Sequence, residues 1–321
     1  MRRALRLAKK GRGNVLPNPM VGAVIIKDDE RIGEGYHAKF GEEHAEIAAL
    51  NSCTQDPTGA TLYVTLEPCS KEGKTPACTK AIIKAGIKKV VIAAKDPSQN
   101  GTSELEKAGI EVETGILEDA AKDLNKAFFT FHEKNRPFVT LKVAMSLDGK
   151  VAEARGIQTQ ITGEKAQKRV HIFRKNHQAI LVGAGTVLTD NPHLGVRLVE
   201  GNDPLRIILA GDTALPENLK VFRDDNFILL KNKSIKEILE ELHKQNIISV
   251  LVEGGPTVFT EFLKAQAVDE IQLLMAPKTL GQNALNFLEE NNNISLSIRS
   301  VRKLSPDVLI TATPKWDSNN G

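Results

Sequence analysis

The chain has 321 residues, of which 41% are hydrophobic and 26% are charged, and its formal net charge is only +3. These are ordinary values for a globular protein, and this length predicts about two domains, each with its own buried core. The mild, mixed charge does not favour a nucleic-acid or membrane surface, no apolar run approaches the roughly 20 residues that span a bilayer, and the N-terminus lacks the apolar core of a signal peptide.

Strand and helix patterns alternate along the whole chain, which predicts an α/β protein. The polar segment 132–137 separates two such alternations, so we expect domains at 1–136 and 137–321, with a frayed tail after Pro314. In the first half we predict helix 2–10, strand 21–27, a turn at 28–30, strand 31–36, helix 43–52, strand 60–66, helix 77–85, strand 89–94, helix 103–108, strand 110–114 and helix 118–133. Strand 138–145 then opens the second half.

His44, Glu46, Cys69 and Cys78 together have the composition of a zinc-dependent deaminase site. One imidazole and two thiolates are three protein ligands, which leave the fourth tetrahedral position of zinc for water, as in catalytic sites. A carboxylate two residues after the histidine, itself not a ligand, moves protons in zinc nucleobase deaminases. We therefore predict one zinc ion per chain, with Glu46 as the catalytic acid–base group.

Each of these residues also has a more ordinary explanation. A His-Ala-Glu tripeptide is common, and intracellular cysteines are often just small buried residues. Cys69 follows a predicted strand, however, and Cys78 stands at a predicted helix start, where thiol pKa values are depressed. Cys53 lies about 13 Å beyond His44 on what we expect to be one helix, so we assign it as a structural or surface thiol. Three cysteines, two of them assigned as metal ligands, leave no disulfide framework, and this fits a reducing cytoplasm.

The second half has two strand–glycine–helix junctions, 179–186 and 250–257, that could hold phosphate groups. Glycines let backbone amides approach an anion at a helix start, and Pro256 suits an early helical position. Either junction could equally be only a tight turn. The Rossmann fingerprint Gly-x-Gly-x-x-Gly is absent.

Several motifs closely resemble the bifunctional deaminase/reductase family of riboflavin biosynthesis. The deaminase motifs are Pro17-Asn18-Pro19-Met20-Val21-Gly22, Gly33-Glu34-Gly35-Tyr36-His37, His44-Ala45-Glu46, and Thr65-Leu66-Glu67-Pro68-Cys69 with its long spacing to Cys78. The reductase motifs lie at 147–150, 179–192 and 250–257, so the resemblance covers essentially the whole chain. It implies a cytidine-deaminase-like three-layer domain followed by a dihydrofolate-reductase-like α/β domain.

The resemblance also implies a reaction and its site residues. A diaminopyrimidinone carrying a ribosylamino 5'-phosphate would lose ammonia and then be reduced by NADPH to the ribityl compound, in a cytoplasmic homo-oligomer without nucleic-acid or membrane partners. NADPH contacts are implied at Ala144, Thr186, Asp190, Gly254, Gly255, Pro256 and Thr257. Substrate contacts are implied at Asn18, His37 and Lys74, and at Arg174, Leu194, Arg197 and Glu253. A guanidinium fork matches a phosphate, although either arginine could be an ordinary surface residue.

The chain also departs from the family pattern. Lys71 stands where relatives have histidine, and Gln158 and Gln160 stand where they have serine and tryptophan, a loss of about 1 kcal/mol of packing beside the cofactor. Two other functions remain possible. The first is a nucleic-acid base deaminase with an unrelated second domain, which the long cysteine spacing and the lack of a basic surface interleaved with aromatic residues disfavour. The second is a zinc-stabilised module that senses a nucleotide.

Overall fold

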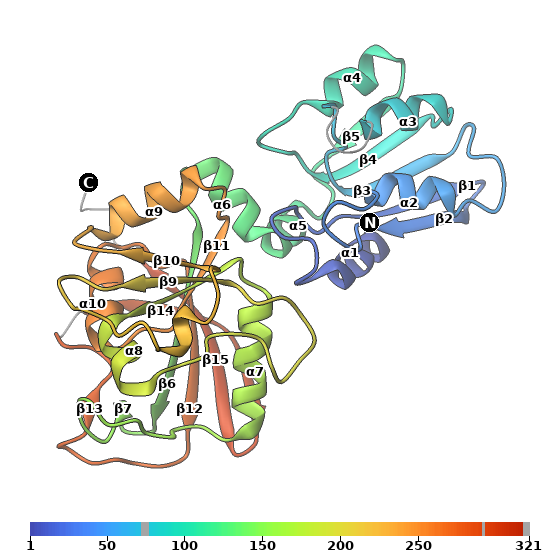
Figure 1. The fold of residues 1–321 in the computed structure, drawn as a ribbon. Coiled ribbons are helices and arrows are strands. Elements are labelled where there is room, and N and C mark those ends of the chain that lie inside the picture. Colours follow the sequence, from blue (N-terminus) through green and yellow to red (C-terminus); the bar gives the residue numbers. More distant parts are fainter. Residues whose placement is uncertain (72–76, 291–292, 317–321) are drawn as a thin grey trace. The chain divides into compact units, whose positions relative to one another are not determined.

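The computed structural model describes residues 1–71, 77–290 and 293–316. The chain divides into two compact units, Met1–Lys134 and Asn135–Gly321. Each unit is built around its own β-sheet, with helices packed against it (Figure 1).

The first unit contains a five-stranded sheet in the order β2-β1-β3-β4-β5. The strands β3, β4 and β5 are parallel, whereas β1 is antiparallel to both of its neighbours. The elements are α1 Arg2–Ala8, a 3-10 turn Lys9–Gly11, β1 Gly22–Lys27, β2 Glu30–Tyr36, α2 Ala45–Asn51, β3 Thr61–Leu66, α3 Cys78–Lys84, β4 Lys89–Ala94, α4 Gly101–Lys107, β5 Glu111–Thr114, α5 Glu118–Leu124 and α6 Lys126–Lys134.

Helices cover both faces of this sheet, as its side-chain alternation requires. In β1, Ala23 and Ile25 face a core that includes Ala45 and Ala49 of α2 and Ile82 of α3. Val24 points the other way, toward Ala4 and Leu7 of α1. The result is a three-layer unit whose sheet is buried on both sides.

The predicted helix 118–133 is wrong in one respect, because the structure has two helices there. α5 ends at Leu124, Asn125 has φ −112° and ψ 27°, and α6 starts at Lys126. The Asn125 carboxamide bonds the backbone of Met20, which ties the break to a distant segment. The helix predicted at 43–52 is also shorter than expected: His44 precedes it with extended backbone, and α2 begins at Ala45.

The second unit contains an eight-stranded sheet in the order β10-β9-β8-β11-β6-β12-β15-β14. The first six strands in this order, from β10 across to β12, are parallel to their neighbours. The last two, β15 and β14, extend the sheet as antiparallel strands. The elements are β6 Phe138–Ser146, β7 Lys150–Ala152, α7 Glu164–Lys175, β8 Ala179–Gly183, α8 Ala184–Asp190, β9 Leu205–Leu209, a 3-10 turn Lys220–Phe222, β10 Phe227–Leu230, α9 Ile235–Lys244, β11 Ser249–Val252, α10 Pro256–Lys264, β12 Glu270–Ala276, β13 Leu285–Asn286, β14 Ser295–Leu304 and β15 Asp307–Lys315.

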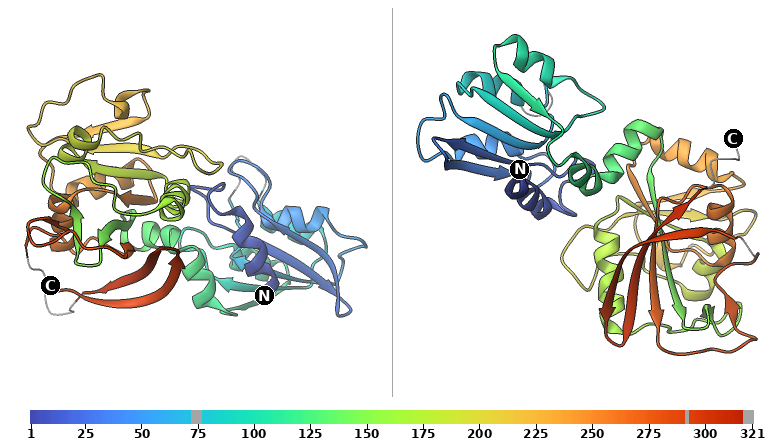
Figure 2. Two further views of the ribbon diagram at one scale, coloured as in Figure 1. Left: turned by 90° about the horizontal axis from the view of Figure 1, so that it is seen from below. Right: turned by 180° about the vertical axis from the view of Figure 1, so that it is seen from behind.

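Helices lie on both faces of the parallel part of this sheet. α9 and α10 pack on one face through Leu242 and Phe262, and α7 and α8 pack on the other through Phe173 and Val187. The antiparallel end is different, because β14 and β15, red in Figure 2, run without a helix in front of them in the right-hand view. The predicted frayed tail after Pro314 is wrong for Lys315, which belongs to β15, and residues 317–321, on which that prediction also falls, lie outside the described part.

No helix in the described residues is long and apolar enough to cross a membrane.

Candidate active sites

The fold brings His44, Cys69 and Cys78 together in the first unit. His44 caps the start of α2, Cys69 follows β3, and Cys78 is the first residue of α3. Their ligand atoms all lie within 4.8 Å of one another, and Nδ1 of His44 is 3.5 Å from Sγ of Cys69 and 3.3 Å from Sγ of Cys78. A tetrahedral zinc ion, with bonds of about 2.0 Å to nitrogen and 2.3 Å to sulfur, holds such atoms about 3.5 Å apart. The donor set therefore fits zinc.

The protonation of the two clustered thiols is unequal. Hydrogen bonds from Cys78 and then from His44 lower the pKa of Cys69 to about 4. The pKa of Cys78 is raised, because its proton is shared with Cys69 and because it is buried. Cys69 is thus the thiol that more readily supplies a thiolate, and zinc binding would displace the shared proton.

Glu46 lies in the first turn of α2, and its side chain is buried beside the cluster. Burial raises the pKa of Glu46 to about 7 in the metal-free chain, although its own backbone amide and His44 oppose this. A carboxyl group with a pKa near neutrality can both accept and donate a proton at physiological pH. The structure thus has a buried carboxyl group next to the cluster of His44, Cys69 and Cys78.

Cys53 is not part of this cluster. Its thiol donates to the carbonyl of Ala49 at 3.4 Å and packs against the core of the first unit. This agrees with its assignment as a structural thiol.

Asn18 and His37, two of the predicted substrate contacts, lie next to the metal cluster. Nδ2 of Asn18 is 3.2 Å from Nε2 of His37, whose Nδ1 is 3.0 Å from the carbonyl of Glu43. The ring of His37 meets the ring of His44 edge-on, with centroids 5.4 Å apart. The third predicted contact, Lys74, lies outside the described residues.

Lys71, which replaces the histidine of relatives, lies two residues after Cys69. Its ammonium donates to the carbonyl of Ser98 at 3.2 Å and remains exposed. The loop after Asp96 therefore contacts the substituted residue directly.

Glu67 is a buried residue whose structural importance was not predicted from the sequence. Its carboxylate accepts from the backbone amide of Asp96 at 3.0 Å and from that of Thr102 at 2.7 Å. These bonds fix the loop after β4 and the start of α4 beside Pro68 and Cys69. The available signal was a glutamate directly after the apolar strand β3, because a carboxylate buried at such a place needs hydrogen-bond partners.

In the second unit, one pocket of about 1030 Å³ lies where parallel strands meet helix starts. This is the usual position for ligands in open α/β sheets. Every residue predicted to contact NADPH lines it, from Ala144 on β6 to Thr257 on α10. The predicted substrate contacts Arg174, Leu194, Arg197 and Glu253 line the same pocket.

The two glycines of the second junction have different surroundings. A Cβ atom on Gly254 would lie 2.6 Å from Cβ of Val258, in the first turn of α10, so a larger residue at position 254 would clash with this helix. A Cβ atom on Gly255 would instead meet only Oγ1 of Thr186, at 3.5 Å. Gly255 and Thr186 thus leave between them a narrow space, at the starts of α10 and α8, that a side chain would fill. Such a cradle of backbone donors fits the phosphates of a dinucleotide.

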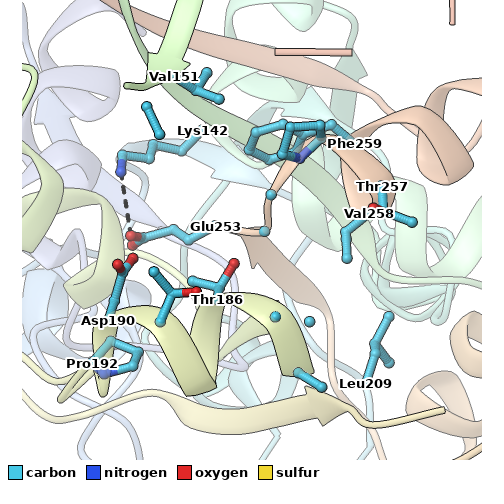
Figure 3. A pocket seen from close by; sticks show the side chains of 18 of the residues that line it. Lys142, Val151, Thr186, Asp190, Pro192, Leu209, Glu253, Thr257, Val258 and Phe259 are labelled. Atoms are coloured by element: carbon cyan, nitrogen blue, oxygen red, sulfur yellow. Dashed lines mark hydrogen bonds and ion pairs between the residues drawn. The ribbon is translucent and has the colours of Figure 1, made fainter. Parts of the chain in front are cut away.

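Glu253 is the centre of a buried ion cluster at the opposite side of the pocket. It accepts from Nε and Nη2 of Arg174 at 2.8 and 2.9 Å, and from Nζ of Lys142 at 3.4 Å. Burial alone would raise its pKa, but Arg174 and then Lys142 overcome this and lower it to about 2. Figure 3 shows Lys142, Glu253 and Asp190 gathered on one side, with Thr257 and Val258 on the other.

Lys142 is a pocket residue that no sequence motif marked. Lys142 interrupts the otherwise apolar strand β6 and lines the pocket with its side chain mostly buried. A single lysine inside a buried parallel strand was the available signal, because an unpaired ammonium there is costly.

Leu194 and Arg197 occupy the segment after α8. Leu194 is buried, with a left-handed φ of 57°, whereas the side chain of Arg197 is exposed and its backbone amide donates to Nδ1 of His171 at 2.9 Å. Burial and then Arg174 lower the pKa of His171, and burial followed by Arg174 also lowers that of Arg197. This end of the pocket therefore has a positive potential suited to an anion.

Gln160, at the position where relatives have tryptophan, lines the pocket. Its Nε2 donates to the carbonyl of Thr162, and its own carbonyl accepts from Nζ of Lys278 at 2.6 Å. The side chain is therefore held by one local hydrogen bond, and the Lys278 bond holds the backbone, where an aromatic ring would offer a stacking surface.

The chain matches known families in both halves. Residues 1–94 match the cytidine and deoxycytidylate deaminase zinc-binding region, and residues 137–310 match the RibD C-terminal domain. The riboflavin biosynthesis protein RibD of Aquifex aeolicus is 40% identical, and the alignment covers 97% of this chain and 96% of that protein. The RibD of Bacillus amyloliquefaciens is also 40% identical, over 100% of this chain and 97% of the relative.

Solved structures agree with these matches. The RibD of Acinetobacter baumannii (form 1) superposes with a TM-score of 0.94 at 37% identity, over 98% of each chain. A diaminohydroxyphosphoribosylaminopyrimidine deaminase/5-amino-6-(5-phosphoribosylamino)uracil reductase from Thermotoga maritima gives a TM-score of 0.89 at 41% identity, over 98% of this chain and 97% of that one. The predicted fold, a cytidine-deaminase-like half joined to a dihydrofolate-reductase-like half, is confirmed.

Two reactive centres therefore belong to one polypeptide, a zinc-binding deaminase half and an NADPH-dependent reductase half. The chain belongs to the RibD family, and it is a bifunctional deaminase and reductase of riboflavin biosynthesis.

Proposed function

We propose that His44, through Nδ1, and the thiolates of Cys69 and Cys78 hold the zinc ion, and that Glu46 is the proton-transfer group. The observation that carries this assignment is the convergence of the three ligand atoms within 4.8 Å, beside a buried carboxyl. A bound zinc ion would supply Lewis acidity that activates water near neutral pH. Glu46 accepts a proton from the attacking water and delivers it to the departing amine, so that ammonia leaves.

Asn18 and His37 are the proposed substrate contacts of this half. Their side chains are hydrogen-bonded to each other and lie beside His44, so both can meet the pyrimidine ring or its ribosyl group. Lys74 is kept as a third proposed contact on the resemblance alone. The proposed substrate is the diaminopyrimidinone with a ribosylamino 5'-phosphate that gives the Thermotoga maritima relative its name.

In the second half, the proposed cofactor contacts are Ala144, Thr186, Asp190, Gly254, Gly255, Pro256 and Thr257. Bound NADPH supplies the hydride. The space between Gly255 and Thr186 supports a dinucleotide phosphate at the start of α10. This space and the positive end of the pocket near Arg197 belong to the same pocket, so the cofactor and the deaminated pyrimidine would be bound side by side.

The substrate contacts proposed in the reductase half are Arg174, Leu194, Arg197 and Glu253. Arg197 is the exposed guanidinium at the positive end of the pocket, and it can pair with the substrate phosphate. Arg174 is bidentate to Glu253, so besides its proposed substrate contact it holds that carboxylate in place. Lys142 is held by Glu253 with its ammonium in the pocket, where it can donate a hydrogen bond to the ribosyl oxygen that gains charge on reduction.

The direct test is to incubate the purified chain with the phosphorylated diaminopyrimidinone, with and without NADPH. We expect ammonia release in both cases and NADPH oxidation only after deamination. Ammonia release without any NADPH oxidation would contradict the second half of the proposal, and NADPH oxidation before ammonia release would contradict the order.

We propose that the two activities follow the domains 1–136 and 137–321. The division of the chain after Lys134 supports this boundary. Arg136 donates to both carboxylate oxygens of Asp269, at 2.6 and 2.7 Å, so a chain that starts at Asn135 keeps this anchor. Such a chain should fold and still reduce pre-deaminated substrate. A requirement for zinc in that reduction would contradict the two-site assignment.

We propose that the chain forms a homo-oligomer through the open face of its larger sheet. On β14, Leu296, Ile298 and Val301 are 44%, 64% and 61% exposed. A bulge after Ile298 keeps all three on one face, opposite Pro314, Ala312 and Ile310 of β15. An exposed apolar row on an edge strand favours burial against a second copy. Ile298→Lys should lower the mass measured by light scattering, whereas Ser297→Lys, on the other face of β14, should not.

We propose a reducing, cytoplasmic location as well. Cys53, Cys69 and Cys78 are all free thiols, and the metal site needs two of them reduced. Inactivation of the deaminase half by mild oxidants, with zinc release, would support this requirement, and full activity after oxidation would contradict it.

A further inference from the structure

Asn125 occupies an unusual position in the first unit. It lies between α5 and α6, outside both helices, yet it is only 5% exposed. The match to the deaminase zinc-binding region ends at residue 94, so Asn125 lies beyond the segment that defines that region. A buried asparagine at a helix break must find partners, since an unpaired carboxamide is costly to bury.

The partners of Asn125 are both backbone groups of one residue 105 positions away. Oδ1 accepts from the amide of Met20 at 2.8 Å, and Nδ2 donates to the carbonyl of Met20 at 2.9 Å. A primary carboxamide offers one donor and one acceptor in a plane, as a neighbouring strand does. Asn125 thus acts as one rung of a β-ladder for a segment that precedes β1.

That segment leads directly to the deaminase site. Asn18 is two residues before Met20, and its side chain bonds His37, whose ring touches that of His44. Val21, the residue after Met20, accepts from the backbone amide of His37 at 3.0 Å. Fixing Met20 therefore fixes the backbone on which both proposed substrate contacts depend.

We infer that Asn125 is a positioning residue for the deamination reaction, which orders the segment 18–21 so that Asn18 and His37 meet the substrate. This rests on the proposed roles of Asn18 and His37. A segment ordered in advance binds its ligand without the entropy loss of ordering it, so the effect should fall on substrate affinity. The zinc ligands come from other segments, at α2, after β3 and at α3, and should be unaffected.

The test uses the full-length, zinc-loaded protein with Asn125→Ala and Asn125→Asp. Aspartate has the same size and can still accept from Met20, but it faces the Met20 carbonyl with a second acceptor in place of a donor. We expect both variants to raise the KM of deamination about tenfold, as the loss of one or two hydrogen bonds would, with a smaller change in kcat. Zinc content and reduction of pre-deaminated substrate should match wild type and show that both units are folded.

The matched control is Leu124→Ala, which removes a neighbouring buried side chain without touching the carboxamide. Hydrogen exchange at Met20 should quicken in the Asn125 variants and not in this control. An unchanged KM in Asn125→Asp, or an equal rise of KM in Leu124→Ala, would overturn the inference. If wild type itself releases no ammonia, the proposed function has failed instead, so the two failures are distinguishable.

Discussion

The two centres of this chain are built in contrasting ways. The deaminase centre depends on a few titrating side chains whose ligand atoms lie within 4.8 Å of one another. The reductase centre is a pocket of about 1030 Å³ whose best-defined feature is the space between Gly255 and Thr186. In the first, we propose a distinct chemical role for each group, whereas in the second we propose that the shape of the backbone and many weaker contacts hold the ligand.

This difference predicts how the two halves respond to substitution. Removing a metal ligand or a proton carrier should abolish a reaction, because nothing else supplies that chemistry. Changing one of many pocket contacts should shift affinity by degrees, unless the change fills the space that the ligand needs.

The largest expected effect is at the metal cluster. Cys69→Ser and Cys78→Ser should lose both the zinc ion and deamination. Glu46→Gln should keep one zinc ion per chain but lower the deamination rate about 10²–10⁴-fold, because it removes only proton transfer. Zinc analysis together with ammonia release measures both. Reduction of pre-deaminated substrate is the internal control. Zinc loss in Glu46→Gln comparable to that of the cysteine variants would show that Glu46 is a ligand after all.

The next effect is at the phosphate cradle. Gly255→Val should weaken NADPH binding by about 10²-fold, because a branched side chain would fill the space facing Thr186 where backbone donors approach the cofactor phosphate. Fluorescence titration with NADPH measures it. Gly163→Val is the matched control, because Gly163 is likewise the N-cap glycine of a helix, α7, and its Cβ would also lie 3.5 Å from the nearest atom, but it does not line the pocket, so the change should cost far less. Wild-type affinity in Gly255→Val would mean that the junction is only a tight turn.

A third effect is the pH dependence of stability that Glu253 causes. Its folded pKa is lowered to about 2 from an ordinary 4.5, so ionisation stabilises the fold above about pH 4.5, and this stabilisation is lost as the pH falls toward 2. That shift corresponds to about 3 kcal/mol. The difference in unfolding free energy between wild type and Glu253→Gln should therefore shrink as the pH is lowered through this window. A difference that stays constant from pH 7 to pH 3 would contradict the ion cluster.

The smallest effect is at Gln160. Gln160→Trp should tighten NADPH binding only severalfold, because stacking adds about 0.5–1.5 kcal/mol to a pocket that other contacts already define. The same fluorescence titration applies, with Gln158→Ser as the control for restoring the other family residue. A gain of a hundredfold or more would mean that the missing aromatic ring dominates cofactor binding in this half, against the contrast drawn above.

Short motifs alone were sufficient to predict the metal centre. His44, Glu46, Cys69 and Cys78 carry a chemical signature that depends on residue type and spacing, and a zinc ion accepts few donor sets. Periodicity also predicted most strands, and β4 has the predicted bounds, because a strand buried on both faces is a continuous apolar run bounded by turns. The pairing of the two domain types was likewise readable from motifs that cover the whole chain.

Other features were decided only by tertiary contacts. Nothing local marks Asn125 as the end of α5, because its partners lie 105 residues away on Met20. A charge in an apolar run marks Lys142 and Glu67 in the sequence, but only the structure shows which partners they have, and the different surroundings of Gly254 and Gly255 depend on where Val258 and Thr186 lie. Sequence spacing records which chemistry is present, whereas hydrogen bonds and close packing between distant segments depend on three-dimensional distances that no local pattern encodes.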